Sequence, residues 1–323
     1  MQIILITIAT ILALTFIGIS AYNFLSGKSL IKDVIHFYSL KKKSVADLDE
    51  DWVKAKIKSD IIISLTTIPE RIDSIELTIK SLLYQKKQSA RIHLNIPYVS
   101  FRNQKEYVIP EWLKSLKSVN IVRIEEDFGP ASKFIPSLKK LEPDQPILVV
   151  DDDNIYPPNY VKDFDEAGKE HPDIILAASG WRVPDDLIDK STTLLSNIKR
   201  IPPTPLPGTR INHLFRTDII QGYSGYLLRP KFFDLDAIDN YDGVPQKVRF
   251  VDDVWVSAQA KVEKFIFPIS RFCYVPFFQN DFYKASSLAK INNYNRVDNR
   301  DRNNSIALRF FEKKWGKDKE SLT

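Results

Sequence analysis

One stretch near the middle of the chain limits the possible folds more than any other. Residues 147–150 are Ile-Leu-Val-Val, and three aspartates, Asp151, Asp152 and Asp153, follow at once. A short run that is apolar at every position is typical of a strand buried on both faces, as in a parallel sheet covered by helices. Because unpaired carboxylates are costly to bury, the chain must leave the sheet at Asp151. We therefore expect an α/β fold with an acidic rim at the carboxyl end of this strand, where open α/β sheets bind ligands.

The Asp triplet itself has two interpretations. Side chains alternate along a strand, so Asp151 and Asp153 point to one side and Asp152 to the other. Two carboxylates on one side suit a hard divalent cation that also holds phosphate oxygens and water. The alternative is a solvated turn without a ligand. The apolar run before the triplet and the Tyr-Pro-Pro after it favour the metal site, with Asp151 and Asp153 as ligands.

The N-terminal segment carries a different signal. Residues 1–27 contain no charged side chain, and residues 3–25 are almost wholly Ile, Leu, Ala, Thr and Phe. About 20 apolar residues are enough to cross a bilayer. The alternative is a cleaved signal peptide, which has a basic start and a shorter apolar core. We expect an uncleaved, single-pass membrane anchor over residues 1–27.

Charge and cysteine content bear on orientation and partners. Five lysines lie between residues 28 and 43 and none before them, so the positive-inside rule predicts that the rest of the chain is cytoplasmic. The single cysteine, Cys273, allows no internal disulfide, which fits a reducing compartment. The lumen of the secretory pathway is the alternative location. A net charge of +5 is too modest to indicate nucleic-acid binding.

The pattern after the anchor predicts one main domain. Residues 28–59 have mixed charge and predict a linker, residues 60–310 the domain, and residues 311–323 a charged tail. The domain alternates strands with helices, which favours a mostly parallel sheet with helices on both faces. Strands are expected at residues 61–65, 91–96, 120–124, 147–150 and 173–178, and helices near residues 31–40, 75–83, 131–141, 160–169 and 254–262. Residues 181–218 break the pattern and form either a lid or a plain excursion.

Two later motifs add polar groups. Gly222 and Gly225 stand among aromatic residues, which predicts close approach of the backbone to a ligand or neighbour. Asp252 and Asp253 precede the helix expected from residue 254. An aspartate there is either an N-cap or a carboxylate that acts as a general base.

Taken together, four pieces resemble the nucleotide-sugar glycosyltransferases of the GT-A fold. They are residues 61–67, 147–153, 221–228 and 251–255, and the resemblance covers about residues 60–278. It implies a Rossmann-like sheet and a nucleotide-diphosphate sugar as donor. It also implies that the triplet acts as an Asp-x-Asp motif that holds Mn²⁺ or Mg²⁺ against the diphosphate.

The resemblance also assigns roles to individual residues. Asp252 and Asp253 become candidates for the base of an inverting transfer, with Asp253 preferred. The donor would contact eight residues: Thr66, Thr67, Arg71, Lys133, Asp151, Asp152, Gly222 and Gly225. For Lys133 a surface lysine is the alternative. Many family members have a further histidine ligand near the C-terminus, whereas the last histidine here, His213, precedes Asp252.

The predicted function is that of a membrane-anchored, metal-dependent glycosyltransferase with a glycan or glycolipid acceptor. Two alternatives remain. A metal-dependent phosphohydrolase uses similar aspartates but usually more ligands than this chain offers. A non-catalytic, membrane-tethered protein that binds nucleotide sugars would keep the site without turnover.

Overall fold

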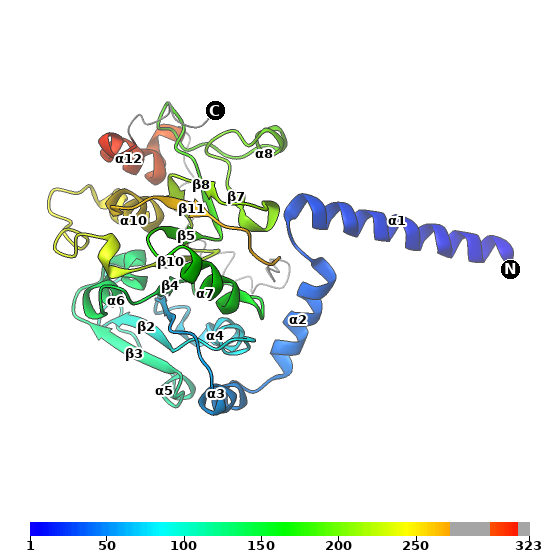
Figure 1. Cartoon of the computed structure of the whole chain (residues 1–323), viewed down its shortest axis with the longest axis horizontal. Helices are drawn as coiled ribbons and strands as arrows, with labels where there is room; N and C mark the ends of the chain where they lie inside the picture. The colour runs from blue at the N-terminus through cyan, green and yellow to red at the C-terminus, as the bar shows by residue number, and fades with distance from the viewer. Residues whose placement is uncertain (272–297, 316–323) are drawn as a thin grey trace.

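The computed structural model describes residues 1–271 and 298–315, and Cys273 lies outside them. It confirms the α/β fold, with an eight-stranded, mostly parallel sheet between helices (Figure 1). The strands of this sheet, in spatial order, are β3 (Val119–Ile124), β2 (Arg91–Pro97), β1 (Ile62–Leu65), β4 (Ile147–Val149), β10 (Tyr226–Leu228), β5 (Ile175–Ala177), β11 (Lys264–Ile266) and β8 (Phe215–Arg216). A three-stranded sheet contains β7 (Leu206–Pro207), β6 (Ser179–Trp181) and β9 (Ile219–Ile220).

The described helices precede, connect and cover these strands. They are α1 (Gln2–Ser26), α2 (Leu30–Lys42), α3 (Val45–Lys54), α4 (Glu76–Leu83), α5 (Glu111–Lys114), α6 (Ile135–Lys140), α7 (Tyr160–Glu170), α8 (Leu194–Lys199), α9 (Gln246–Arg249), α10 (Asp252–Gln259) and α12 (Asn303–Phe310). The irregular segment of residues 181–218, expected to be a lid or a plain excursion, contains α8, β7 and β8.

Strand direction decides where the polar loops meet. β3, β2, β1 and β4 are parallel neighbours, and β10 runs antiparallel between β4 and β5. Ser64 of β1 pairs with Val149 of β4. The carboxyl ends of β1 and β4 therefore lie side by side, and the Asp triplet, which follows β4, lies beside the loop that leaves β1.

The apolar run at β4 is explained by two separate cores. Leu148 and Val150 belong to the cluster that includes residues of α3, α4 and α7, whereas Ile147 and Val149 belong to the cluster that includes residues of α6, α10 and α12. All four side chains are fully buried. Alternation along the strand thus buries every residue, as expected for a sheet covered on both faces.

Two predicted helices have different bounds in the structure. The helix expected at residues 131–141 is divided into a 3-10 helix, Gly129–Lys133, and α6. Pro136 lies in the first turn of α6, where its missing N–H costs least, so the α-helix begins there rather than earlier. The helix expected from residue 254 begins at Asp252.

The segment expected to be a linker packs on the domain over much of its length. Leu48 and Trp52 of α3 belong to the core, and the Trp52 Nε1–H donates to the carbonyl of Ser89 over 2.9 Å. Asp49 accepts from the backbone N–H groups of Lys117 and Ser118. The packing of α3 on the domain could not be predicted from the charge pattern, because only one face of α3 is apolar. Similarly, residues 311–315 of the expected tail pack on α10 and α12, and residues 316–323 lie outside the description.

Replacing Trp52 with alanine should therefore destabilise the whole domain. Trp52 is 6% exposed, and truncation of a buried aromatic residue costs about 3–5 kcal/mol. Chemical denaturation measures this loss. Val53→Ala is the matched control, because Val53 is 45% exposed on the same helix and should change stability by less than about 0.5 kcal/mol. Equal effects of the two changes would show that α3 is not part of the cooperative unit.

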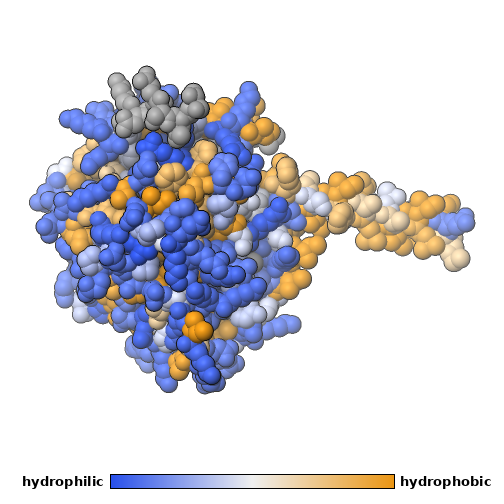
Figure 2. All heavy atoms as spheres, in the orientation of Figure 1, coloured by the Kyte–Doolittle hydropathy of each residue, from blue (hydrophilic) through white to orange (hydrophobic). Residues whose placement is uncertain are grey.

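α1 differs from every other described helix in its surroundings. It is long and apolar enough to cross a membrane, and no residue of its span is buried in the structure. Figure 2 shows it as an orange, hydrophobic arm that leaves an otherwise mostly blue surface. By length and composition α1 thus agrees with the expected anchor, which remains a prediction.

Deletion of residues 1–27 should release a folded, detergent-independent protein. The reason is that α1 contributes no buried side chain to either core. Size-exclusion chromatography without detergent and a cooperative thermal transition would verify the expectation. Loss of that transition would mean that α1 is a structural part of the domain.

Candidate active site

The candidate site lies where β1 and β4 end. The Thr67 hydroxyl donates to Asp152 over 2.5 Å, and the Thr66 hydroxyl donates to the carbonyl of Asn95 over 2.7 Å. Both hydroxyls thus bond within the protein and fix the loop beside the Asp triplet. Contact of these threonines with a nucleotide remains a prediction.

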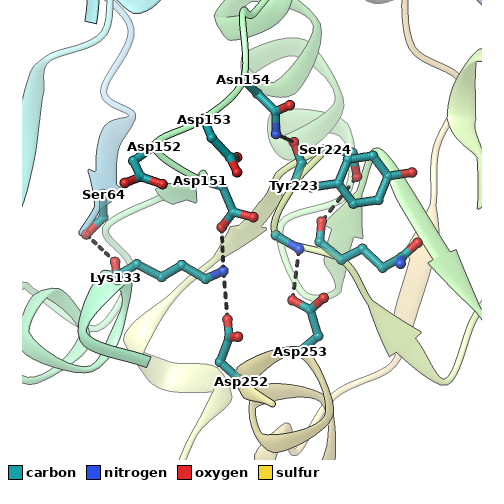
Figure 3. A network of polar contacts seen from close by, with 12 residues as sticks. Ser64, Lys133, Asp151, Asp152, Asp153, Asn154, Tyr223, Ser224, Asp252 and Asp253 are labelled. Atoms are coloured by element: carbon teal, nitrogen blue, oxygen red, sulfur yellow. Dashed lines mark hydrogen bonds and ion pairs between the residues drawn. The ribbon is translucent and has the colours of Figure 1, made fainter. Parts of the chain in front are cut away.

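The triplet itself divides into a buried and a more accessible part. Asp152 is 4% exposed, and its carboxylate pairs with Arg71 over 3.1 Å. The same Arg71 Nη1 reaches Asp153, also at 3.1 Å, and the Asp153 side chain keeps 34% exposure. Figure 3 shows Asp151 and Asp153 directed toward one space and Asp152 turned away from it, the alternation that the sequence indicated.

Lys133 joins the triplet to the second acidic motif. Its ammonium lies 2.6 Å from Asp151 and 2.7 Å from Asp252, and Figure 3 shows it between them. The alternative of a surface lysine is wrong, because Lys133 is 5% exposed. Burial alone would lower its pKa, but the two carboxylates raise that pKa well above its usual range. Lys133 is therefore a permanent cation in the site.

Asp252 and Asp253 occupy the first turn of α10, and neither is its N-cap. The cap position belongs to Val251, without a side-chain hydrogen bond. Asp253 instead accepts from the backbone N–H of Gly222 over 2.9 Å. A Cβ on Gly222 would come within 2.3 Å of the Lys133 ammonium, so a larger residue there would displace that ammonium from its position between the carboxylates. The sequence prediction of a glycine at a crowded site is thus explained by the lysine.

Carboxylates outnumber cationic side chains between the Asp triplet and the start of α10. Burial, and then the two other aspartates of the triplet, raise the pKa of Asp153 to about 7. Burial, and then the neighbouring Asp252, raise the pKa of Asp253 well above its usual range. Such shifts arise where carboxylates crowd one another in a buried site. The site would therefore gain from a further cation, even with Lys133 and Arg71 present.

Asp151 and Asp153 fit a divalent cation that takes only part of its coordination shell from the protein. Asp151 and Asp153 offer hard carboxylate oxygens toward one space, beside an excess of negative charge. Among residues 1–271 and 298–315, no group of three or more His, Cys, Asp and Glu side chains could hold a metal ion. Mg²⁺-type sites commonly use one or two carboxylates together with substrate phosphates and water.

Two tyrosines support the site and were not singled out from the sequence. The Tyr156 hydroxyl accepts from the Asp151 N–H over 3.0 Å, so it holds the backbone of the triplet. The Tyr160 hydroxyl donates to the Ser224 carbonyl, and a Cβ on Gly225 would come within 1.7 Å of it. Gly225 also has φ +88°, which only glycine adopts readily. Gly225 is thus required for packing.

Replacing Lys133 with methionine should destabilise the protein by about 3–5 kcal/mol in the absence of divalent metal, because it removes one partner from buried ion pairs. Chemical denaturation in the presence of a chelator measures the change. Lys139→Met is the matched control, because Lys139 pairs with Asp239 at the surface of α6, where such pairs contribute about 0–1 kcal/mol. A Lys133 variant as stable as the control would contradict the pairing.

A cavity of about 150 Å³ adjoins the site. Asn154, Ile155 and Tyr156 line it from the residues after the triplet, and Tyr223 and Ser224 from the residues after Gly222; Ser26, Lys28, Pro157, Pro207 and Thr209 complete it. The end of α1 therefore forms part of the wall of a cavity beside the candidate site.

The chain has low similarity to known proteins. No family model and no curated protein sequence matches it. Solved structures that match part of the chain include that of GalNAc-T7 with UDP, GalNAc and Mn²⁺ (TM-score 0.43, 14% identity, 67% of this chain and 42% of that chain). Another is S. aureus TarS 1-349 (TM-score 0.35, 16% identity, 74% of this chain and 66% of that chain). The chain spans less than two thirds of the first and just under two thirds of the second, and likeness at this level supports no conclusion about the site.

Proposed function

We propose that this protein is a membrane-anchored, metal-dependent glycosyltransferase of the GT-A type. It would move a sugar from a nucleotide-diphosphate sugar to a glycan or lipid-linked acceptor, with inversion at the anomeric carbon. One observation supports this most strongly: Lys133 joins the Asp triplet after β4 to the acidic pair at the start of α10. Two acidic motifs about 100 residues apart in sequence thus face one space at the carboxyl edge of parallel strands.

In this proposal most of the site residues bind or position the donor, and one residue, Asp253, acts on the acceptor. Asp151 and Asp153 would hold Mn²⁺ or Mg²⁺, which when bound supplies positive charge to the leaving diphosphate. Lys133 contributes a second, fixed cation beside them and orients Asp151. Arg71 holds Asp152 and Asp153 in place, which keeps the loop from spreading as its carboxylates repel one another.

Asp253 is the proposed base. As the acceptor oxygen bonds to the anomeric carbon, its proton passes to the Asp253 carboxylate. The bond from the anomeric carbon to the diphosphate oxygen breaks, and the nucleotide diphosphate leaves with the electron pair. Asp252 is less suited to this role because its carboxylate already pairs with Lys133 at 2.7 Å. A raised pKa, as Asp253 has, makes a carboxylate a stronger base.

The position of the cavity favours a lipid-linked acceptor over a soluble glycan. Its wall includes Ser26 and Lys28, at the end of the proposed membrane helix, and Asn154 directly after the triplet. An acceptor headgroup at the membrane surface would thus lie within reach of the site. The lysines after α1 support a cytoplasmic location of the domain.

A nucleotide-sugar screen by thermal shift, with and without Mn²⁺, tests the proposal in the full-length protein. A donor that binds the folded state raises the melting temperature, and Mn²⁺ should strengthen this shift. Mass spectrometry of lipid and glycan acceptors incubated with that donor should then show an added sugar. Release of phosphate without transfer would favour the phosphohydrolase, and metal-dependent binding without turnover on a broad acceptor panel would favour the binding protein.

A further inference from the structure

The helix that follows the membrane helix has two opposite faces, and one of them is exposed and apolar. Asp33, His36, Phe37 and Leu40 of α2 are buried against the domain. On the opposite side, Ile31, Ile35 and Tyr38 are 55%, 64% and 47% exposed. Their spacing of four and three residues places them in one row along the helix. We call this row the α2 outer face.

Lysines border this face on both sides. At 100° per residue, Lys32 and Lys41 lie at its two edges, and Lys42 continues the row at its C-terminal end. Lys32, Lys41 and Lys42 are all exposed. An apolar row with lysines along both edges is the arrangement of helices that lie in the interface of a membrane, where the lysine stems reach up to the headgroups.

The structure holds α2 in this orientation. His36 Nε2 lies 3.2 Å from the carbonyl of Tyr156, and the His36 ring stacks on Tyr84 at 5.8 Å. Rotation of α2 to bury its outer face would break these contacts and expose Phe37 and Leu40. The apolar face is therefore fixed toward the outside.

α2 also begins where the membrane helix ends. Gly27, at φ +67°, follows α1, and the backbone N–H of Leu30 donates to the Asn23 side chain over 2.8 Å. Figure 1 shows α2 turning away from the line of α1 and running along the side of the domain. In Figure 2, hydrophobic residues continue from α1 onto this side. A bilayer crossed by α1 would thus have its surface along α2.

We propose that the α2 outer face lies in the headgroup region of a bilayer that contains anionic lipids. This membrane contact goes beyond the proposed transferase activity, since the contact would form whether or not the domain transfers sugar. Two features favour a lipid surface over a second copy of the chain. The face is continuous with a helix that itself needs lipid, and the lysines along both edges would repel the same lysines of another copy. The contact fixes the domain against the membrane and sets the cavity beside Ser26 and Lys28 at the level of the headgroups.

The test uses the full chain, reconstituted in nanodiscs of phosphatidylcholine with and without phosphatidylglycerol. Cysteine replaces Ile35 in a Cys273→Ser background and carries an environment-sensitive fluorophore, and the nanodiscs contain lipids with a nitroxide near the headgroup. We expect quenching and a blue shift of the emission at position 35, both larger with phosphatidylglycerol. Lys32→Glu with Lys41→Glu should reduce this gain from phosphatidylglycerol.

Two control positions make the outcome decisive. A label at Ile11 of α1, quenched by a deep acyl-chain nitroxide, verifies that the helix has inserted. A label at Phe310 is the matched control, because Phe310 is an apolar residue with 43% exposure and its helix, α12, lies on the side of the domain away from α1 (Figure 1). If position 11 is quenched but position 35 behaves like position 310, the proposal is wrong. Shielding of position 35 together with cross-linking between copies would instead assign the face to a dimer.

Discussion

Replacing Asp253 with asparagine should lower the rate of sugar transfer by about 10²- to 10⁴-fold and leave donor affinity nearly unchanged. This is the usual cost of losing a general base. The structure supports Asp253 over its neighbour because Asp253 accepts from the Gly222 N–H, whereas Asp252 forms an ion pair with Lys133. Asparagine keeps an oxygen for the Gly222 N–H but cannot take up the proton of the acceptor.

Steady-state kinetics of transfer, with donor binding measured separately by calorimetry, verify this expectation. Asp252→Asn is the matched control, since it changes the adjacent carboxylate on the same helical turn. Its main effect should be on stability, because Lys133 would keep only Asp151 as a partner. If Asp252→Asn shows the selective loss of rate instead, the base is Asp252. Retention of the anomeric configuration in the product would overturn the inverting mechanism with either residue.

Replacing Asp153 with asparagine should abolish the effect of Mn²⁺ on both donor binding and transfer. The charge that a metal ion supplies to a leaving phosphate contributes several kcal/mol, which corresponds to a loss in rate of at least about 10²-fold. The fold should persist because the Asp153 side chain is 34% exposed and asparagine occupies nearly the same volume. Asp151→Asn should likewise abolish the effect of Mn²⁺ on donor binding and transfer. It should also lower stability, because Asp151 pairs with Lys133.

The thermal shift with donor and Mn²⁺ separates a metal ligand from a structural carboxylate. Asp152→Asn provides the comparison within the triplet. Asp152 is buried between Thr67 and Arg71, so its replacement should lower the melting temperature of the free protein. A normal Mn²⁺-dependent shift and normal activity in both Asp151→Asn and Asp153→Asn would show that the triplet is a turn without a metal.

Local pattern was enough to identify β1 to β5 and the edge that carries the site, whereas β10, which lies between β4 and β5, was not predicted. The unbroken apolar run of residues 147–150 requires burial on both faces, and the structure places its side chains alternately in two cores. Carboxylates directly after such a run must leave the core at a strand end, because burying them unpaired is too costly. These inferences depend on residues adjacent in sequence, which is why no tertiary information was needed for them.

The partners of those carboxylates depend on the tertiary structure. Lys133 pairs with Asp252, and the Gly222 N–H with Asp253, across long separations in sequence that no periodicity connects. The same holds for α3, whose charged surface resembles a linker until Trp52 is seen in the core. Residues 147–153 thus determined by themselves that this is an α/β protein with an acidic strand end. Which cation balances each aspartate, and which aspartate is left to act as a base, was decided only by the packing of α10 and the Gly129–Lys133 turn against that strand end, because ion pairs depend on distance in space rather than on separation along the chain.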